Sequence, residues 1–572
     1  MSFRWIYAEP DEEVVSRLRE QLGVVQVIAR MLALRGINDY DLAKTFFRPS
    51  ITGLHDPFLM KDMDKGAARL AEAVRTQETV VIYGDYDVDG TTATAIMYTF
   101  LKDFGLKAYY YIPHRFKEGY GINKEGIAFA KDKGAGLIVS VDCGITAIDE
   151  AEHARELGID LIICDHHNAG ETLPNATAVL DPKRLDCNYP FDGLSGAGVG
   201  FKLIQATLTK LGLPAEVAYK FLDLVAISTA SDIVPINGEN RILMREGLRL
   251  IKTEPRPGIK ALIDLIQLNP QKITTTQIVF SIGPRINAAG RMGDAGAAVD
   301  LMIADNEADA NAGALELEAI NVRRRTTDTL TMDQAVAFLD ENFNREQMST
   351  LVLHDPGWHL GVIGIVASRL VELYCRPTIM LSTVDGQIKG SARSIKGFNI
   401  YNALKQCEDL LVKFGGHEYA AGLTIEEAQL DEFRARFDKI AGGMLCQDDF
   451  EPELNIDAEL DLSEINTGFW KIMKQFEPYG PTNLAPLFVS KGLSLRGKAT
   501  IVGKGHLKMR LVQNGSAPFD AIGFNMHQFL PAINASPQGK INIAYALEEN
   551  TWRNQTKLQL RLKDIRVGGV SF

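Results

Sequence analysis

The sequence predicts a multidomain α/β protein with a parallel-sheet domain, a long connecting helix, a smaller α/β domain and a C-terminal β-barrel or sandwich. Its 572 residues exceed what one hydrophobic core can hold and suggest three to four domains. Between Thr79 and Asp165, short apolar runs alternate with helical stretches, which is the pattern of βαβ units around a parallel sheet. From about Pro452 onward, β-type segments dominate.

The bulk composition is that of a soluble globular protein, with 46% hydrophobic and 23% charged residues. No apolar run approaches the roughly 18 residues of a membrane span, and the N-terminus lacks a signal-peptide pattern, so we expect a cytoplasmic protein. Six cysteines without a C-x-x-C pair indicate free thiols rather than a disulfide framework. The net charge of −12 argues weakly against nucleic acid as a partner, although steering depends on the local potential.

The first α/β region follows a segment, residues 1 to about 50, that looks helical. Short buried strands are expected at Thr79–Gly84, Ala108–Pro113, Leu137–Asp142, Leu161–Asp165 and Ala178–Leu180. Helices are expected at Thr92–Phe104, Lys124–Lys133, Ala147–Leu157, Val199–Leu211 and Phe221–Ser228.

The second half of the chain begins with residues 304–342, which contain almost no helix breakers and predict one or two long helices. A second α/β region is expected to contain Thr350–Leu353, Gly361–Leu373, Thr378–Leu381 and a Gly-rich element at Phe414–Gly422. Five later strands are expected at Leu487–Leu495, Leu507–Val512, Ala521–Phe524, Ile541–Ala546 and Leu558–Ile565. The domain ranges that follow are 1–50, 51–303, 304–342, 343–448 and 449–572.

An Asp-rich loop, Asp85 to Gly90, directly follows the first strand. Its three carboxylates repel one another and raise each other's pKa unless a cation compensates. The D-x-D-x-D-G spelling resembles a calcium-binding EF-hand loop, but position twelve is Ile96 rather than a bidentate Glu, and a strand rather than a helix precedes the loop. The loop therefore predicts a cation site of another kind.

Two later strands also end in ligand-type residues, Asp142 and the triplet Asp165-His166-His167. Ligands of an open parallel sheet bind at the carboxyl ends of its strands. A single Asp there is equally well explained as a helix N-cap, but three such strand ends together predict a metal site. Asp and His ligands suit Mn²⁺, with Mg²⁺ or Zn²⁺ as alternatives. Two metals held this way are typical of hydrolytic phosphoesterases, and the chain has no nucleophile elbow or P-loop motif.

These motifs resemble those of the DHH phosphoesterase family, whose name comes from the Asp165-His166-His167 triplet. Ser231-Asp232 resembles the fourth family motif. Within the family, the chain is most similar to the bacterial 5′-to-3′ exonucleases that act on single-stranded DNA. That similarity runs from about residue 20 to the final strands and rests on the segments Ile112–Gly121, Gly283–Arg291, Pro356–His359 and Gly415–His417.

The resemblance implies two Mn²⁺ ions, with Mg²⁺ as a substitute, and a fold in which an OB-fold barrel follows the DHH and DHH-associated domains. The ligands that it implies are Asp85, Asp87, Asp89, Asp142, His166 and Asp232. Asp142 would bridge the two ions, Asp165 would orient the His pair, and His167 would approach the scissile phosphate. From the bare sequence, Asp232 before Ile-Val-Pro is better explained as an ordinary cap or turn residue than as a ligand.

The same resemblance assigns substrate contacts. Arg115 and Tyr120 would lie on the DNA path, with Tyr120 stacking a base. Without the resemblance, a Tyr between two glycines is better explained as a turn residue. Arg285 and the segment with Ser391 and Arg393 would bind a 5′-terminal phosphate, the alternative being a solvated basic loop. The remaining pair, His359 and His417, would either reach the phosphate or satisfy turn backbone, and the sequence leaves both open. Candidate contacts of the barrel are Lys504, His506, Lys508, Arg510, Trp552 and Arg553.

The function implied is a metal-dependent 5′-to-3′ exonuclease on single-stranded DNA that releases nucleoside 5′-monophosphates in DNA repair and recombination. Single-strand-binding protein and a DNA helicase are the implied partners of a monomer, and the extra C-terminal domain of longer relatives is not expected here. One alternative is a family phosphatase of short oligonucleotides or cyclic dinucleotides, which would need no long groove. The other is a catalytically silent replication scaffold, against which the intact acidic motifs argue.

Overall fold

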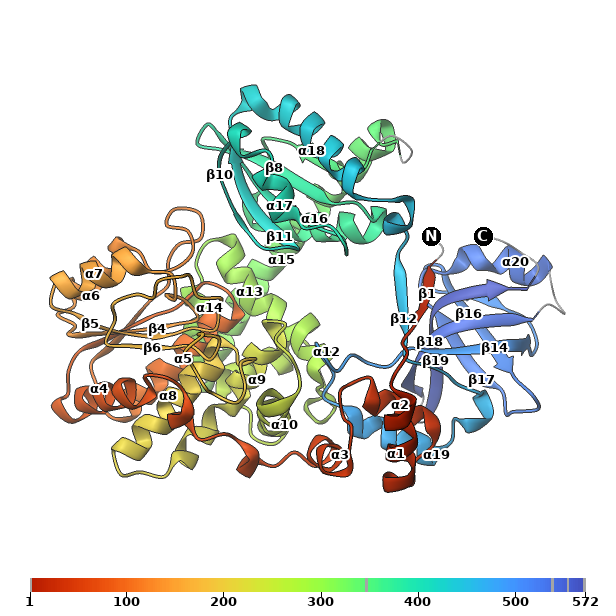
Figure 1. Ribbon diagram of the computed structural model, residues 1–572, viewed down its shortest axis with the longest axis horizontal. Coiled ribbons are helices and arrows are strands. Elements are labelled where there is room, and N and C mark those ends of the chain that lie inside the picture. The colour runs from red at the N-terminus through yellow and green to blue at the C-terminus, as the bar shows by residue number, and fades with distance from the viewer. Residues whose placement is uncertain (1–2, 345–347, 536–539, 553–554, 569–572) are drawn as a thin grey trace. The chain divides into compact units, whose positions relative to one another are not determined.

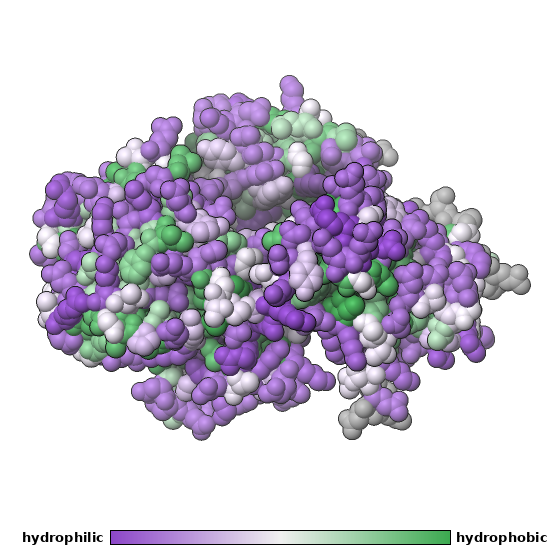
Figure 2. Space-filling model, turned by 60° about the horizontal axis from the view of Figure 1, so that its bottom comes forward, coloured by the Kyte–Doolittle hydropathy of each residue, from purple (hydrophilic) through white to green (hydrophobic). Residues whose placement is uncertain are grey.

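The structure is a computed structural model that describes residues 3–344, 348–535, 540–552 and 555–568. The chain divides into two compact units (Figure 1). One unit is Pro49–Leu445, and the other combines Met1–Arg48 with Cys446–Phe572. No helix in the described ranges is long and apolar enough to cross a membrane. The face shown in Figure 2 is mostly hydrophilic, with apolar patches scattered over it.

The larger unit contains a five-stranded parallel sheet of order β3-β2-β4-β5-β6. Its strands are β2 (Val80–Tyr83), β3 (Ala108–Tyr111), β4 (Leu137–Val141), β5 (Asp160–Cys164) and β6 (Ala178–Leu180). After β2 the chain adds β3 on one side and then β4 on the other side of β2. The carboxyl ends of β2 and β4 therefore flank the switch point, where α/β sheets of this order bind their ligands.

The strands of this sheet are apolar because helices cover both faces. Alternate residues of β4 and β5 join two different cores, one with α4, α5 and α8 and the other with α6 and α7. These helices are α4 (Met63–Thr76), α5 (Val88–Asp103), α6 (Lys124–Asp132), α7 (Ile148–Glu156) and α8 (Gly196–Lys210). The domain continues through α9 (Leu222–Ser231), α10 (Gly238–Thr253), α11 (Pro257–Leu265), α12 (Thr275–Gln277), α13 (Gly283–Met292) and α14 (Gly296–Ile303).

A single helix, α15 (Glu307–Asn342), connects this domain to the next. It has 36 residues and is therefore about 54 Å long. Asn306 begins it, with a side chain that accepts a hydrogen bond from the backbone N–H of Asp309. A second sheet follows, of order β10-β11-β9-β8-β7. Its elements are β7 (Leu351–His354), α16 (Leu360–Tyr374), β8 (Thr378–Val384), β9 (Gln387–Arg393), α17 (Ile400–Lys405), β10 (Leu411–Gly416), β11 (Ala420–Ile425) and α18 (Leu430–Met444).

The smaller unit is a β-barrel with helices packed against it. Five strands close in the order β14-β16-β17-β19-β18, all antiparallel except the β17–β19 pair, as in an OB-fold. They are β14 (Phe488–Leu495), β16 (His506–Val512), β17 (Phe519–Gly523), β18 (Ile541–Trp552) and β19 (Gln555–Val567). The shorter elements are β12 (Glu453–Ile456), β13 (Ala458–Glu459), α19 (Thr467–Met473), β15 (Thr500–Val502) and α20 (Leu530–Ala535).

The N-terminal segment belongs to this barrel unit and is not wholly helical as predicted. Strand β1 (Arg4–Tyr7) pairs in parallel with β12, and helices α1 (Glu12–Leu22), α2 (Gln26–Ala33) and α3 (Tyr40–Phe47) share a core with the barrel strands. The sequence missed β1 because its pairing partner lies about 450 residues away. The predicted fold class is otherwise confirmed, including the parallel sheet, the long helix and the C-terminal barrel.

Candidate metal centre and phosphate-binding cluster

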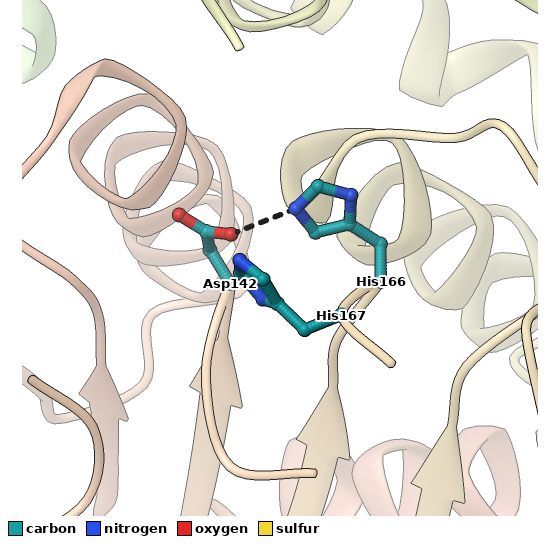
Figure 3. Close-up of side chains that lie close together, drawn as sticks. All are labelled: Asp142, His166 and His167. Atoms are coloured by element: carbon teal, nitrogen blue, oxygen red, sulfur yellow. Dashed lines mark ion pairs between the residues drawn. The ribbon is translucent and has the colours of Figure 1, made fainter. Parts of the chain in front are cut away.

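The carboxylates and histidines predicted from the sequence meet at the carboxyl edge of the parallel sheet. Asp85 follows β2, Asp142 follows β4, and His166 and His167 follow β5. Figure 3 shows Asp142, His166 and His167 converging above their strands. Asp232, at the end of α9, reaches the same place from the helical side. The strand-end rule therefore brings together residues that are up to about 150 positions apart.

His166 lies at the centre of this metal-site cluster. Its Nε2 lies 3.2 Å from Asp142 Oδ1, 3.4 Å from Asp232 Oδ2 and 3.7 Å from Asp89 Oδ2. Among the described residues, three overlapping groups could each hold a metal ion, because the ligand atoms within each group lie within 4.8 Å of one another. The first group is Asp85, Asp87 and Asp142. The other groups are Asp89, His166, Asp232 and Asp142, His166, His167. Such spacing suits cations shared between several side chains.

The cluster contains buried polar atoms that lack any hydrogen-bond partner within the described ranges. They are Asp85 Oδ1, Asp142 Oδ1, Asp232 Oδ2 and both ring nitrogens of His166. Burial raises the pKa of Asp85, Asp142 and Asp232 well above the ordinary range of a carboxyl, and the neighbouring carboxylates raise it further. Burial also lowers the pKa of His166, which favours the neutral imidazole that binds metals. Divalent cations would satisfy these atoms and offset the charge, so the residues fit a metal centre.

Asp165 supports the two histidines. Its carboxylate accepts hydrogen bonds from the backbone N–H groups of Ile145 at 2.8 Å and His166 at 2.7 Å, and from the His167 ring Nδ1 at 2.7 Å. Burial alone would raise the pKa of Asp165, but the hydrogen bond and charge of His167 bring it below the ordinary value. The same contact raises the pKa of His167 despite its burial. Asp165 is thus an ionised anchor for the imidazole.

Asp89 and Asp87 differ from Asp85 in how their oxygens are used. Asp89 accepts hydrogen bonds from the backbone N–H groups of Gly196 at 2.6 Å and Ala197 at 2.8 Å, and from Ser228 Oγ at 2.7 Å. Its carboxylate therefore fixes the N-terminus of α8 against the cluster. Asp87 is the N-cap of α5, which agrees with the alternative that an Asp after a strand caps the next helix. Burial raises the pKa of Asp87. The ligand assignments of both residues stay predictions.

A group of arginines lies beside the metal-site cluster, and we call Arg115, Arg291 and Arg393 the arginine cluster. The Arg115 guanidinium lies over the ring of Tyr86, 4.8 Å from its centroid, and Tyr86 is part of the Asp-rich loop. Burial, followed by the charges of Arg115, Arg393 and Arg324, lowers the pKa of Arg291 to about 10. Burial and Arg115 lower the pKa of Arg393, whose Nη1 donates to Ser391 Oγ at 2.9 Å. Mutually repelling, partly buried guanidiniums form a site for an anion.

Two close backbone approaches hold α13, which carries Arg291, beside the Asp-rich loop. A Cβ at Gly290 would lie 2.0 Å from the carbonyl oxygen of Tyr86, and a Cβ at Gly361 would lie 1.9 Å from that of Arg291. Both positions therefore require glycine. The consequence is that α13 touches the Asp-rich loop on one side and the start of α16 on the other.

Sequence reasoning chose Arg285 for the phosphate pocket and missed Arg291. Arg285 Nε pairs with Glu318 Oε2 at 2.6 Å, and its Nη1 donates to the Ser281 carbonyl at 2.7 Å. Arg291 has no carboxylate partner within the described part of the chain. Both arginines lie in the segment that carried the resemblance, so a preference for Arg291 depends on knowing which face of α13 meets the loop. The assignment of Arg285 stays a prediction that its ion pair weakens.

The other predicted contact residues fall in different places. Tyr120 is close to His167, with its hydroxyl 3.1 Å from the ring Nδ1. His359 is the N-cap of α16, accepts from the Gly361 N–H at 3.0 Å and packs edge-on against Phe116. His417 is exposed on the β10–β11 hairpin, and among the described residues we find no contact between it and either cluster. The cap role agrees with the alternative that His359 satisfies turn backbone.

On the barrel, the predicted contacts are only partly described. The His506 ring lies 5.0 Å from that of Phe524, Arg510 pairs with Asp520 at 3.1 Å, and Lys508 is exposed. The Trp552 side chain and Arg553 lie outside the described residues. Sequence reasoning missed Phe524, which is 49% exposed beneath the Arg561 guanidinium. Aromatic and basic side chains on one barrel face are typical of a surface for single-stranded nucleic acid.

Comparison of the chain with known proteins identifies its family. Residues 79–229 match the DHH family N-terminal domain, residues 346–443 the DHHA1 domain and residues 456–564 the RecJ OB domain. The single-stranded-DNA-specific exonuclease RecJ of Bacillus subtilis is 37% identical over 567 residues, which are 99% of this chain and 71% of that protein.

Two solved structures support the same conclusion. The crystal structure of RecJ in complex with Mn²⁺ from Thermus thermophilus is 30% identical with a TM-score of 0.84, over 99% of this chain and 80% of that one. RecJ of the same organism in complex with Mg²⁺ is 28% identical with a TM-score of 0.78, over 99% and 78% of the two chains. The resemblance to DHH phosphoesterases seen in the motifs is thus confirmed, and this chain belongs to the RecJ family of single-stranded-DNA-specific exonucleases.

Proposed function

We propose that this chain is a metal-dependent exonuclease that degrades single-stranded DNA from its 5′ end and releases nucleoside 5′-monophosphates. The observation that carries the proposal is the contact between two clusters of opposite charge. The metal-site cluster has buried carboxylate oxygens that accept no hydrogen bond from the described residues, and Tyr86 in the same loop lies under Arg115 of the arginine cluster. A DNA 5′ end offers a matching pair of groups, a terminal phosphate and the first phosphodiester.

The metal-site cluster would hold two Mn²⁺ ions, with Mg²⁺ as a substitute. When bound, such ions lower the pKa of water and stabilise the charge of an in-line displacement at phosphorus. We propose Asp85, Asp87, Asp142, His166 and Asp232 as ligands, with Asp142 between the two ions. Asp89 would be a ligand only through lone pairs that its three hydrogen bonds leave free.

The arginine cluster supports the polarity and the product. With the terminal phosphate held by Arg115, Arg291, Arg393 and Ser391, the first phosphodiester would lie over the metal-site cluster. Water would add to that phosphorus and the P–O3′ bond would break, with the leaving oxygen taking a proton. The released nucleotide keeps its 5′-phosphate, and the shortened strand begins with a new one. Asp165 would keep His167 directed at the reacting phosphate.

The barrel supports a single strand as substrate. Lys508, Phe524 and Arg561 share the face of β16, β17 and β19, where Phe524 offers a ring for base stacking and the cations offer contacts to phosphates. We propose that residues 449–572 guide the strand, that 51–303 and 343–448 hydrolyse it, and that 304–342 and 1–50 support these domains. We further propose a cytoplasmic monomer that works with single-strand-binding protein and a helicase in repair and recombination.

An end-labelled degradation assay tests the proposed function. A 5′-labelled single strand should release labelled mononucleotide first with Mn²⁺, more slowly with Mg²⁺ and not with chelator, and a blunt duplex should resist. Release of the 3′ label first would contradict the polarity. Faster cleavage of a cyclic dinucleotide than of the single strand would instead support the small-substrate phosphatase, and binding without cleavage would support the silent scaffold.

A further inference from the structure

Tyr120 is an exposed residue whose hydroxyl makes contacts at the metal-site cluster. It lies in the connection between β3 and α6, and 52% of the residue is exposed. Its hydroxyl nevertheless points inward, donates to the Asp142 carbonyl oxygen at 3.1 Å and lies 3.1 Å from His167 Nδ1. The ring meets the His167 imidazole edge-on, with centroids 5.7 Å apart. Stacking on a base needs only the ring, so this placement leaves the hydroxyl unexplained.

The hydrogen bonds around His167 Nδ1 define what the hydroxyl does. Asp165 Oδ1 lies 2.7 Å from the same nitrogen, against 3.1 Å for the Tyr120 hydroxyl, so an Nδ1–H donates mainly to Asp165. The Tyr120 hydroxyl donates its proton to the Asp142 carbonyl oxygen. Its oxygen can therefore accept a second, weaker hydrogen bond from the His167 Nδ1–H. Asp165 and Tyr120 therefore contact Nδ1 from two sides, and the Nε2 of His167 keeps its lone pair.

The hydrogen bond from Tyr120 to the Asp142 carbonyl lies at the same metal-site cluster. Asp142 has a φ of +61°, in the left-handed region that a non-glycine residue rarely adopts. Its side chain nevertheless reaches His166 at 3.2 Å, so this backbone conformation orients the carboxylate within the metal-site cluster. A hydrogen bond to the Asp142 carbonyl helps to hold that conformation. One hydroxyl thus links the ends of β4 and β5, which carry Asp142 and His167.

We propose that the Tyr120 hydroxyl is a positioning group for His167 and for the Asp142 peptide, in addition to the base contact of the ring. The inference rests on the proposed nuclease function and adds a role for an atom that stacking does not use. It gives the hydroxyl a role that phenylalanine, which would stack on a base equally well, could not supply.

The substitution Tyr120→Phe separates the two roles because it removes the hydroxyl and keeps the ring. Tyr110→Phe is the matched control, since the Tyr110 hydroxyl also donates a hydrogen bond, to Asp300 Oδ1 at 2.6 Å, in the same domain and away from both clusters. The kcat and KM on a 5′-phosphorylated single strand would be measured at saturating Mn²⁺ for both variants, for Tyr120→Ala and for the parent. Thermal unfolding of each protein would accompany the assay.

A positioning hydroxyl predicts that Tyr120→Phe lowers kcat about tenfold with KM within about twofold, as expected for one hydrogen bond that acts in the transition state. Tyr120→Ala should lower kcat and also raise KM, and Tyr110→Phe should match the parent. A Tyr120→Phe enzyme with the parent's kcat, or one altered only in KM, would overturn the inference. So would a loss of kcat accompanied by an equal loss in Tyr110→Phe or by unfolding at the assay temperature. An inactive parent would instead contradict the proposed function.

Discussion

The choice between Arg291 and Arg285 gives the sharpest test of the phosphate pocket. The pKa of Arg291 falls from its usual 12.5 to about 10 because the guanidinium is buried and faces Arg115 and Arg393. At 1.36 kcal/mol for each pKa unit, its charge is disfavoured by about 3 kcal/mol when no anion is present. A bound phosphate would offset this cost and so favour its own binding by about 150-fold in the association constant. Arg285 is already neutralised by Glu318 and has nothing comparable to return.

The assay compares two oligonucleotides of the same sequence, one with a 5′-phosphate and one with a 5′-hydroxyl. The parent should prefer the phosphorylated strand in kcat/KM by about 100-fold, Arg291→Ala should lose most of that preference, and Arg285→Ala should keep it. Because each enzyme is compared with itself on two substrates, a general loss of activity cancels. The reasoning is refuted if Arg285→Ala removes the preference and Arg291→Ala retains it.

Further predictions concern the metal-site cluster and its surroundings. Asp142→Ala should abolish hydrolysis in an Mn²⁺ assay yet melt no lower than the parent in chelator, because it removes one of several repelling buried carboxylates. Mn²⁺ at about 100 times its Kd should stabilise the parent by about 2.7 kcal/mol, seen as a rise in Tm that chelator reverses. Asp165→Asn should cost about 2–4 kcal/mol in denaturant unfolding and at least tenfold in kcat, since an amide cannot accept all its hydrogen bonds. The pKa of Asp165 is lowered, so its contribution is present above the unfolded value near 3.9 and is lost as the pH falls through the folded value. Asp181, which follows β6, should affect the pH dependence of stability in the opposite direction, because burial raises its pKa to about 7. The metal-free protein should therefore lose about 4 kcal/mol of its free energy of unfolding as the pH rises from about 4 to about 7. Asp181→Asn should flatten that part of the pH profile of Tm in chelator, and an unchanged profile would show that Asp181 is not responsible.

The parts of the site that the sequence predicted are those that depend on one strand and the residues after it. Buried strands are visible as apolar runs, so the positions of Asp85, Asp142 and His166 at one edge followed from the strand-end rule alone. Contacts between distant segments were beyond reach. Nothing near Asp89 indicates that its carboxylate is bonded to backbone N–H groups more than 100 residues later.

The arginines illustrate the same limit on a helix. Arg285 and Arg291 are six residues apart on α13 and therefore about 120° apart around its axis. Only one can face the Asp-rich loop, and the choice is made by Glu318 on α15 and by the close approach of Gly290 to Tyr86. The barrel strands, in contrast, were predictable because each is a run of alternating residues bounded by turns.

The pairing of β1 with β12 makes the larger unit an insertion within the smaller one. During synthesis, the apolar faces of α1 to α3 leave the ribosome about 400 residues before the barrel strands that cover them. At about 5–20 residues per second, these faces remain without their partners for roughly 20–80 s, while the inserted unit folds. The first 48 residues can thus complete their core only after the barrel strands are made, and Leu18, Ile28 and Leu32 lack the barrel side of that core for that interval.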